Sequence, residues 1–93
     1  MSPEQRDFLN LRTFPARLSV EQAAYLLNLA EHEVPLFVAK GFLRPLGKPQ
    51  PNSTKWYALT EVMRLHRDEK LLARATDAVR AHWRMKNQRP PGS

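Results

Sequence analysis

The chain has no cysteine and no long apolar run, and both absences exclude classes of protein. Without cysteine there is no disulfide framework, no thiol nucleophile and no thiolate metal site. No apolar segment approaches the roughly 20 residues that a membrane-spanning helix needs. Met1 leads into polar residues rather than into the apolar core of a signal peptide. We therefore expect a cytoplasmic protein without a membrane partner.

Glycine and histidine are also scarce, with 3 of each. The glycines are isolated from one another, so the chain lacks a phosphate-binding glycine loop. The histidines lie far apart in the sequence, without the ligand spacing that is typical of a metal site. Glu31, His32 and Glu33 are neighbours that diverge in direction on a short helix, whereas hydrolysis needs groups that converge in a pocket. We expect no enzymatic activity, no metal site and no cofactor.

Acidic residues are missing from the middle of the chain. The net charge is +6, and no Asp or Glu lies between Glu33 and Glu61. The basic residues of this stretch are Lys40, Arg44, Lys48 and Lys55. Clustered Lys and Arg favour a polyanion, because they displace the counterions that are condensed on phosphate. This distribution favours a nucleic acid or another anionic partner, although a basic surface also serves solubility.

Two short helices joined by a turn are predicted in the first half of the chain. Ser19 and Gln22 have the spacing of a capping box, which begins a helix. Asn28 is suited to end this helix and Gly41 to end the next, because both residues adopt the left-handed conformation readily. We expect the second helix to begin near residue 30 or 31, with Pro35 at the edge of its first turn. The expected buried positions are Val20, Ala23, Ala24 and Leu27, followed by Val34, Phe37 and Val38.

The second half predicts two strands and two helices. Residues 42–46 and 55–59 favour short strands, and the Gly- and Pro-rich segment between them favours an irregular loop. One helix begins near Thr60 and another near Asp68, both at capping residues. The last helix has an apolar stripe made of Leu72, Ala75, Thr76, Val79 and Trp83. The expected fold is mainly α with a small two-stranded antiparallel β-wing, a winged helix-turn-helix.

The length of 93 residues supports one domain with a modest core. Residues 1–15 form an N-terminal arm or a short helix, which Ser2 and Pro3 are suited to begin. Residues 16–86 form the winged helix-turn-helix domain, including the C-terminal helix. Residues 87–93 are expected to be a disordered tail, because they contain Pro90, Pro91 and Gly92.

From residue 18 to about residue 65 the chain resembles the winged helix-turn-helix domains of the MerR-like and phage excisionase-like group. Residues 18–27 read Leu-Ser-Val-Glu-Gln-Ala-Ala-Tyr-Leu-Leu, similar to the Leu-Thr-Val-Glu-Glu-Ala-Ala of the group's first helix. Residues 39–43 read Ala-Lys-Gly-Phe-Leu and resemble its Glu-Gly-Leu-Leu exit from the second helix. Residues 55–57 read Lys-Trp-Tyr, where the group often has an Arg-x-Tyr step. The resemblance lies in the order of these pieces.

The resemblance implies double-stranded DNA binding, as a small transcription regulator or an excisionase-like factor. Residues 31–38 would lie in a major groove, and the wing at residues 44–55 would contact phosphates or the minor groove. Trp56 and Tyr57 are neighbours in a strand, so one should pack in the core and the other face solvent or a sugar. The candidate DNA-binding residues are Arg17, Glu31, His32, Leu36, Lys40, Arg44, Lys48, Lys55 and Trp56.

Two further partners stay open. The group usually has Ser, Thr and Arg at the start of the second helix, whereas this chain has Glu31, His32 and Glu33. That difference leaves a protein-protein interaction module as the alternative, and an exposed Leu36 beside an apolar patch would favour it. A homodimer through the C-terminal helix also stays open, because MerR-like proteins dimerise through such a helix.

Overall fold

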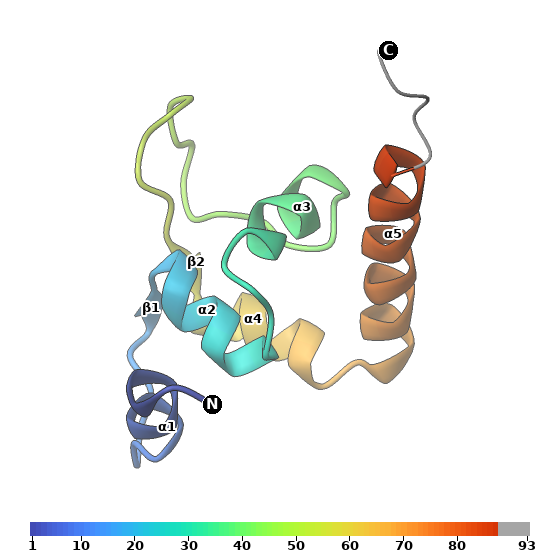
Figure 1. Cartoon of the computed structure of the whole chain (residues 1–93). Coiled ribbons are helices and arrows are strands. Elements are labelled where there is room, and N and C mark those ends of the chain that lie inside the picture. Colours follow the sequence, from blue (N-terminus) through green and yellow to red (C-terminus); the bar gives the residue numbers. More distant parts are fainter. Residues whose placement is uncertain (88–93) are drawn as a thin grey trace.

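The computed structural model describes residues 1–87, which form a mainly helical fold with one small sheet (Figure 1). The helices are α1 (Pro3–Leu9), α2 (Val20–Leu27), α3 (Glu33–Ala39), α4 (Leu59–His66) and α5 (Glu69–Asn87), and the strands are β1 (Arg17–Leu18) and β2 (Tyr57–Ala58). No helix in this part of the chain is both long and apolar enough to cross a bilayer. Asn87 ends α5, and the rest of the expected tail lies outside the described residues.

The N-terminal segment forms a helix that docks against α2. Ser2 caps α1 by accepting a hydrogen bond from the backbone amide of Gln5 at 3.1 Å, and Pro3 occupies the first helical position. The Gln5 side chain donates to the Tyr25 carbonyl of α2 at 3.3 Å. Phe8 is buried, with its ring centroid 5.2 Å from that of Phe14 and 6.0 Å from that of Tyr25. The short helix predicted within residues 1–15 is therefore present and packed.

α2 and α3 end in the same way, each at a residue in the left-handed conformation. Asn28 has a φ of 53°, and the amide of Leu29 donates back to the Ala24 carbonyl at 2.9 Å. Gly41 has a φ of 85°, and the amide of Phe42 donates back to the Phe37 carbonyl at 2.8 Å. These bonds satisfy carbonyl groups that a helix end leaves without partners. The sequence prediction of both helix ends is thus correct.

α3 begins later than residue 30 or 31, and proline explains the shift. Because Glu33 is its first residue, Pro35 stands third, where a helix needs no backbone N–H. The residues before it form a turn in which the Glu33 amide donates to the Ala30 carbonyl at 2.9 Å. The Glu33 carboxylate accepts from the Ala30 amide, also at 2.9 Å. Pro35 therefore costs α3 no internal hydrogen bond.

The sheet differs from the predicted wing. β1 pairs with β2 in antiparallel fashion, with Leu18 opposite Tyr57, so a segment before α2 supplies the partner strand. The prediction that residues 42–46 form a strand is wrong, because that segment has no regular structure. Pro45 lacks the amide that a ladder needs. Across the loop, the Leu46 amide donates to the Trp56 carbonyl at 2.7 Å.

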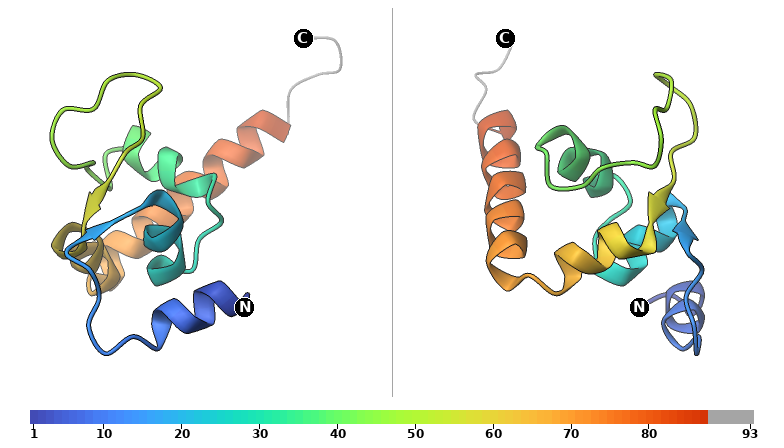
Figure 2. Two further views of the ribbon diagram at one scale, coloured as in Figure 1. Left: turned by 90° about the vertical axis from the view of Figure 1, so that its left-hand side faces the viewer. Right: turned by 180° about the vertical axis from the view of Figure 1, so that it is seen from behind.

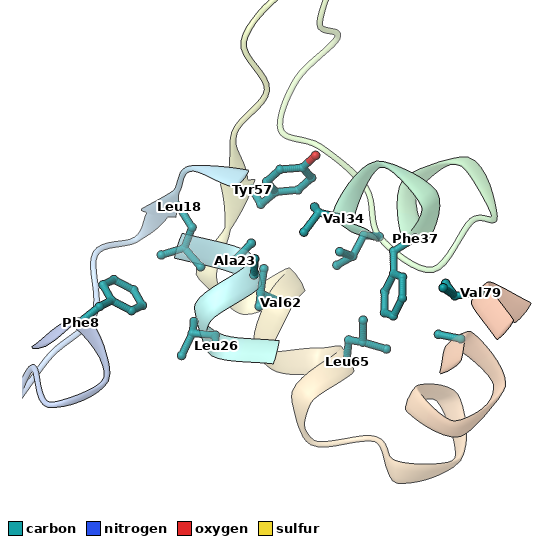
Figure 3. Packing of buried hydrophobic residues seen from close by; sticks show 13 residues of the cluster. Phe8, Leu18, Ala23, Leu26, Val34, Phe37, Tyr57, Val62, Leu65 and Val79 are labelled. Carbon is teal, nitrogen blue, oxygen red and sulfur yellow. The ribbon is translucent and has the colours of Figure 1, made fainter. Parts of the chain in front are cut away.

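The core lies where α2, α3, α4 and α5 meet, with Tyr57 of β2 covering one side (Figure 3). Phe37 of α3 extends toward Leu65 of α4 and Val79 of α5 (Figure 3). The apolar stripe of α5 faces this core, with Ala75 and Val79 buried. This stripe of the C-terminal helix, through which a homodimer was left open, is therefore covered within the chain, and the homodimer stays a prediction.

The buried face of α2 is rotated from the expected one. Ala23 and Ala24 are buried as predicted, but the third buried residue is Leu26, at 8% exposure. Leu27 and Val20 are half-buried at the edge of the core. The reason is tertiary: α1 and α4 both pack against α2 and widen its covered face.

Truncation of the two leucines tests this rotation. Leu26→Ala should lower the free energy of unfolding by about 2–5 kcal/mol, the usual cost of a cavity in a core. Leu27→Ala should cost less, because its side chain already contacts solvent. Urea unfolding followed by circular dichroism measures both values. A larger loss for Leu27→Ala would contradict the rotation.

The buried phenol of Tyr57 predicts a loss of stability in alkali. The side chain is 1% exposed, and burial raises the pKa of Tyr57 above its ordinary value. The folded state favours the neutral phenol, so this stability is complete below about pH 10 and falls as the pH rises toward the folded-state pKa. Tyr57→Phe should therefore lose less stability than the wild type above about pH 10. Parallel losses in urea unfolding at increasing pH would contradict this assignment.

Candidate nucleic-acid interface

Residues 44–55, here called the basic loop, project away from the helices. The loop and α3 lie on the side of the molecule opposite α1 in all views (Figure 1, Figure 2). Its tip is a turn in which the Ser53 hydroxyl donates to the Gln50 carbonyl at 2.6 Å. Gly47 and Asn52 both have a φ of 67°, which lets the chain reverse direction. The loop thus has a defined turn without a strand pair.

The basic loop has cations and no carboxylate. Arg44 and Lys48 are exposed, and neither forms a salt bridge with the acidic groups among residues 1–87. Lys55 is half-buried, and its ammonium donates to the Ser53 carbonyl at 3.2 Å. Arg44 and Lys48 are therefore the cations of this loop with the most freedom to contact a phosphate.

Arg17 and Trp56 form a pair at the base of the basic loop. The β1–β2 pairing brings them together, and the Arg17 guanidinium carbon lies 4.0 Å from the centroid of the Trp56 ring. Attraction to the ring face restrains the guanidinium, and the exposed arginine can still donate from the edges of its fork. Both residues were candidates from the sequence, but nothing in the sequence indicated that they meet. Tyr57, the next residue, is the buried neighbour, as expected from strand alternation.

α3 offers few groups that can contact a base. Its seven residues read Glu-Val-Pro-Leu-Phe-Val-Ala, and none of these side chains can donate a hydrogen bond. Leu36 is half-buried against the core, and Phe37 is 1% exposed. Glu31 and His32 lie in the turn before α3, where both are exposed. Of the predicted base-contact residues, only these two are exposed.

His32 and Lys40 lie beside α5 and not beside the basic loop. The His32 ring lies edge-on to Trp83, with 5.7 Å between ring centroids. Lys40, at the end of α3, lines a groove together with residues of α5 that include His82 and Lys86. The structure therefore separates the predicted cations into two groups, one on each side of α3. Arg17, Arg44, Lys48 and Lys55 belong to the first group, and Lys40 belongs to the second.

Arg64 is a supporting residue that sequence reasoning missed. Its guanidinium forms a salt bridge with Glu61 at 2.6 Å and donates to the Phe42 carbonyl at 3.3 Å. It thereby ties α4 to the segment that leads from α3 into the basic loop. The Glu-x-x-Arg spacing in a helix signals the salt bridge, but only the fold brings Phe42 to it.

No protein-family model, curated protein or solved structure matches the chain. The resemblance to MerR-like and excisionase-like domains therefore stays a prediction from the residues. The coarser fold class, mainly helical with a small two-stranded antiparallel sheet, is confirmed.

A double-mutant cycle measures the Arg17–Trp56 pair. Arg17→Met, Trp56→Leu and the double variant should give a coupling of about 0.5–1 kcal/mol in the free energy of unfolding, the usual range for an exposed cation–π contact. The matched control is a second cycle with Arg12→Met in place of Arg17→Met. Arg12 is another exposed arginine of the same segment. Equal coupling in the two cycles would show that the contact adds no stability.

Proposed function

We propose that the chain binds double-stranded DNA without catalysis, through the basic loop and the exposed side of α3. The observation that carries this proposal is the set of exposed cations at and near the loop, Arg44, Lys48 and Arg17, beside a short helix that follows a helix and a turn. Such a set suits phosphate, because each contact releases a condensed counterion.

A duplex suits this arrangement better than a single strand. A helix that follows a turn can enter a major groove while an adjacent loop contacts the backbone. Single-strand binding relies on exposed aromatic rings that stack on bases. The Trp56 ring is already covered by the Arg17 guanidinium at 4.0 Å. This pairing favours a role for Trp56 in placing a cation rather than in stacking on a base.

Phosphate contacts, rather than base contacts, would supply most of the affinity. α3 has no donor side chain, so it cannot make the bidentate contacts by which Arg, Asn or Gln distinguish bases. Glu31 can accept a hydrogen bond from a cytosine amino group, and His32 can contact a guanine or a phosphate. The role implied by the resemblance, a transcription regulator or an excisionase-like factor, would then draw its sequence preference from these two residues and from DNA shape.

The alternative is a protein-interaction module that uses the surface at the start of α3. It is favoured by the absence of donors on α3 and by the carboxylates of Glu31 and Glu33, which repel phosphate. It is disfavoured by Leu36, which packs against the core instead of lying in an open apolar patch. DNA binding is therefore the better supported of the two.

Fluorescence anisotropy with a random-sequence duplex tests the proposal. We expect a Kd of roughly micromolar or tighter at about 50 mM salt, and much weaker binding at about 200 mM salt, as for other phosphate-binding proteins. No binding at the lower salt concentration would contradict DNA binding and favour the protein-interaction alternative.

A charge-reversed variant locates the contact. Arg44→Glu with Lys48→Glu should weaken binding and lower the slope of log K against log salt by about 1.8 or more, since each phosphate contact contributes about 0.9. The control, Arg67→Glu with Lys70→Glu, makes the same charge change at the α4–α5 junction, away from the basic loop (Figure 1, Figure 2). Both pairs are exposed, so thermal unfolding should change little. Equal losses of affinity in the two variants would contradict a specific role of the basic loop in DNA binding.

A further inference from the structure

A groove of about 790 Å³ separates the end of α3 from the C-terminal half of α5. It is lined by Lys40, Ala78, Ala81, His82, Met85 and Lys86. The end of α3 and the last turns of α5 lie on the same side of the molecule as the basic loop (Figure 1, Figure 2). The groove and the basic loop are therefore on opposite sides of α3 but on one face of the protein.

The charge of this groove has one sign. Lys40, Lys86 and His82 line it, and the lining contains no carboxylate. Neither lysine forms a salt bridge within the part of the chain that the structure describes. The Lys86 ammonium lies 5.1 Å from the Trp83 ring centroid, a contact that leaves its charge unneutralised. The groove is therefore complementary to an anion.

The floor of the groove selects the kind of anion. Ala78 and Ala81 are small, and Met85 is a flexible apolar side chain that is 73% exposed. A free inorganic phosphate gains little from such a floor, because it has no apolar surface. A sugar–phosphate strand has apolar deoxyribose faces that can lie on it, while successive phosphates reach the two lysines.

We propose that this groove binds the sugar–phosphate backbone of the same DNA duplex that the basic loop contacts. The inference rests on the proposed function and adds α5 to the interface. α3 lies between two cationic surfaces, so it can sit in a DNA groove whose two bordering strands are each held by one surface. Such a grip would position α3 even though its own side chains cannot donate to bases.

A purely structural role of the two lysines makes a different prediction. Lys40 follows the last residue of α3 and Lys86 lies in the last turn of α5, where cations stabilise helix ends. In that role their loss would lower the unfolding temperature and leave the salt dependence of DNA binding unchanged.

The decisive variant is Lys40→Gln with Lys86→Gln, compared with the control Arg67→Gln with Lys70→Gln. We expect the first variant to bind random-sequence duplex roughly tenfold or more weakly at about 0.1 M salt, with a salt slope lower by about 1.8. The control should keep the wild-type slope. An unchanged slope in the Lys40→Gln/Lys86→Gln variant would contradict DNA binding at the groove. If the wild type still binds DNA, the proposal for the basic loop is unaffected by that result.

The two tryptophans give each surface its own reporter. Trp83 contacts Lys86, which lines the groove, and Trp56 lies at the base of the basic loop. They are the only tryptophans of the chain. In Trp56→Phe the remaining emission comes from Trp83, and we expect duplex DNA to change it. The groove alone is contradicted if Trp56 responds in Trp83→Phe while Trp56→Phe shows an anisotropy change but no response of Trp83. If neither tryptophan responds and the anisotropy does not change, both the proposed DNA binding and the proposed role of the groove are contradicted.

Discussion

Burial of two side chains of α3, Val34 and Phe37, is the interaction on which the rest of the structure depends. α3 has seven residues, and a helix of this length has little stability alone in water. Val34 is 0% exposed and Phe37 is 1% exposed, and Phe37 extends toward Leu65 of α4 and Val79 of α5 (Figure 3). This packing, rather than helix propensity, holds α3 in place. It also fixes where the chain leaves α3 for the basic loop and where α3 meets α5.

The apolar residues that anchor α3 leave few positions on it for polar side chains. So much of the short helix is apolar that no donor side chain remains on it. The cations lie on the segments that flank it, in the basic loop on one side and at Lys40 and Lys86 on the other. α3 thus lies between two charged surfaces, and the Arg64 side chain donates to the Phe42 carbonyl in the segment that leaves it.

Three helix ends were predicted correctly from local residues, whereas the partner of the strand at Tyr57 was not predicted. Ser19 as a helix start and Asn28 and Gly41 as helix ends depend on the conformational preferences of a few adjacent residues. The partner of the strand at Tyr57 depends on which distant segment can supply free backbone groups. Residues 42–46 contain Pro45, and the residues around Leu18 were free to pair instead. The same reason explains Leu26, which is buried by helices distant in sequence.

By itself, the sequence determined where α2 begins, where α2 and α3 end, the mainly helical class with a small sheet, and a middle segment with basic residues and no acidic ones. These follow from residue preferences and from charge, which do not depend on distant contacts. Only the tertiary structure decided that Arg17 meets Trp56, that Lys40 faces Lys86 across a groove, and that the α5 stripe covers the core of its own chain. Each of these joins segments far apart along the chain, and packing of the whole core selects among the pairings that the local pattern allows.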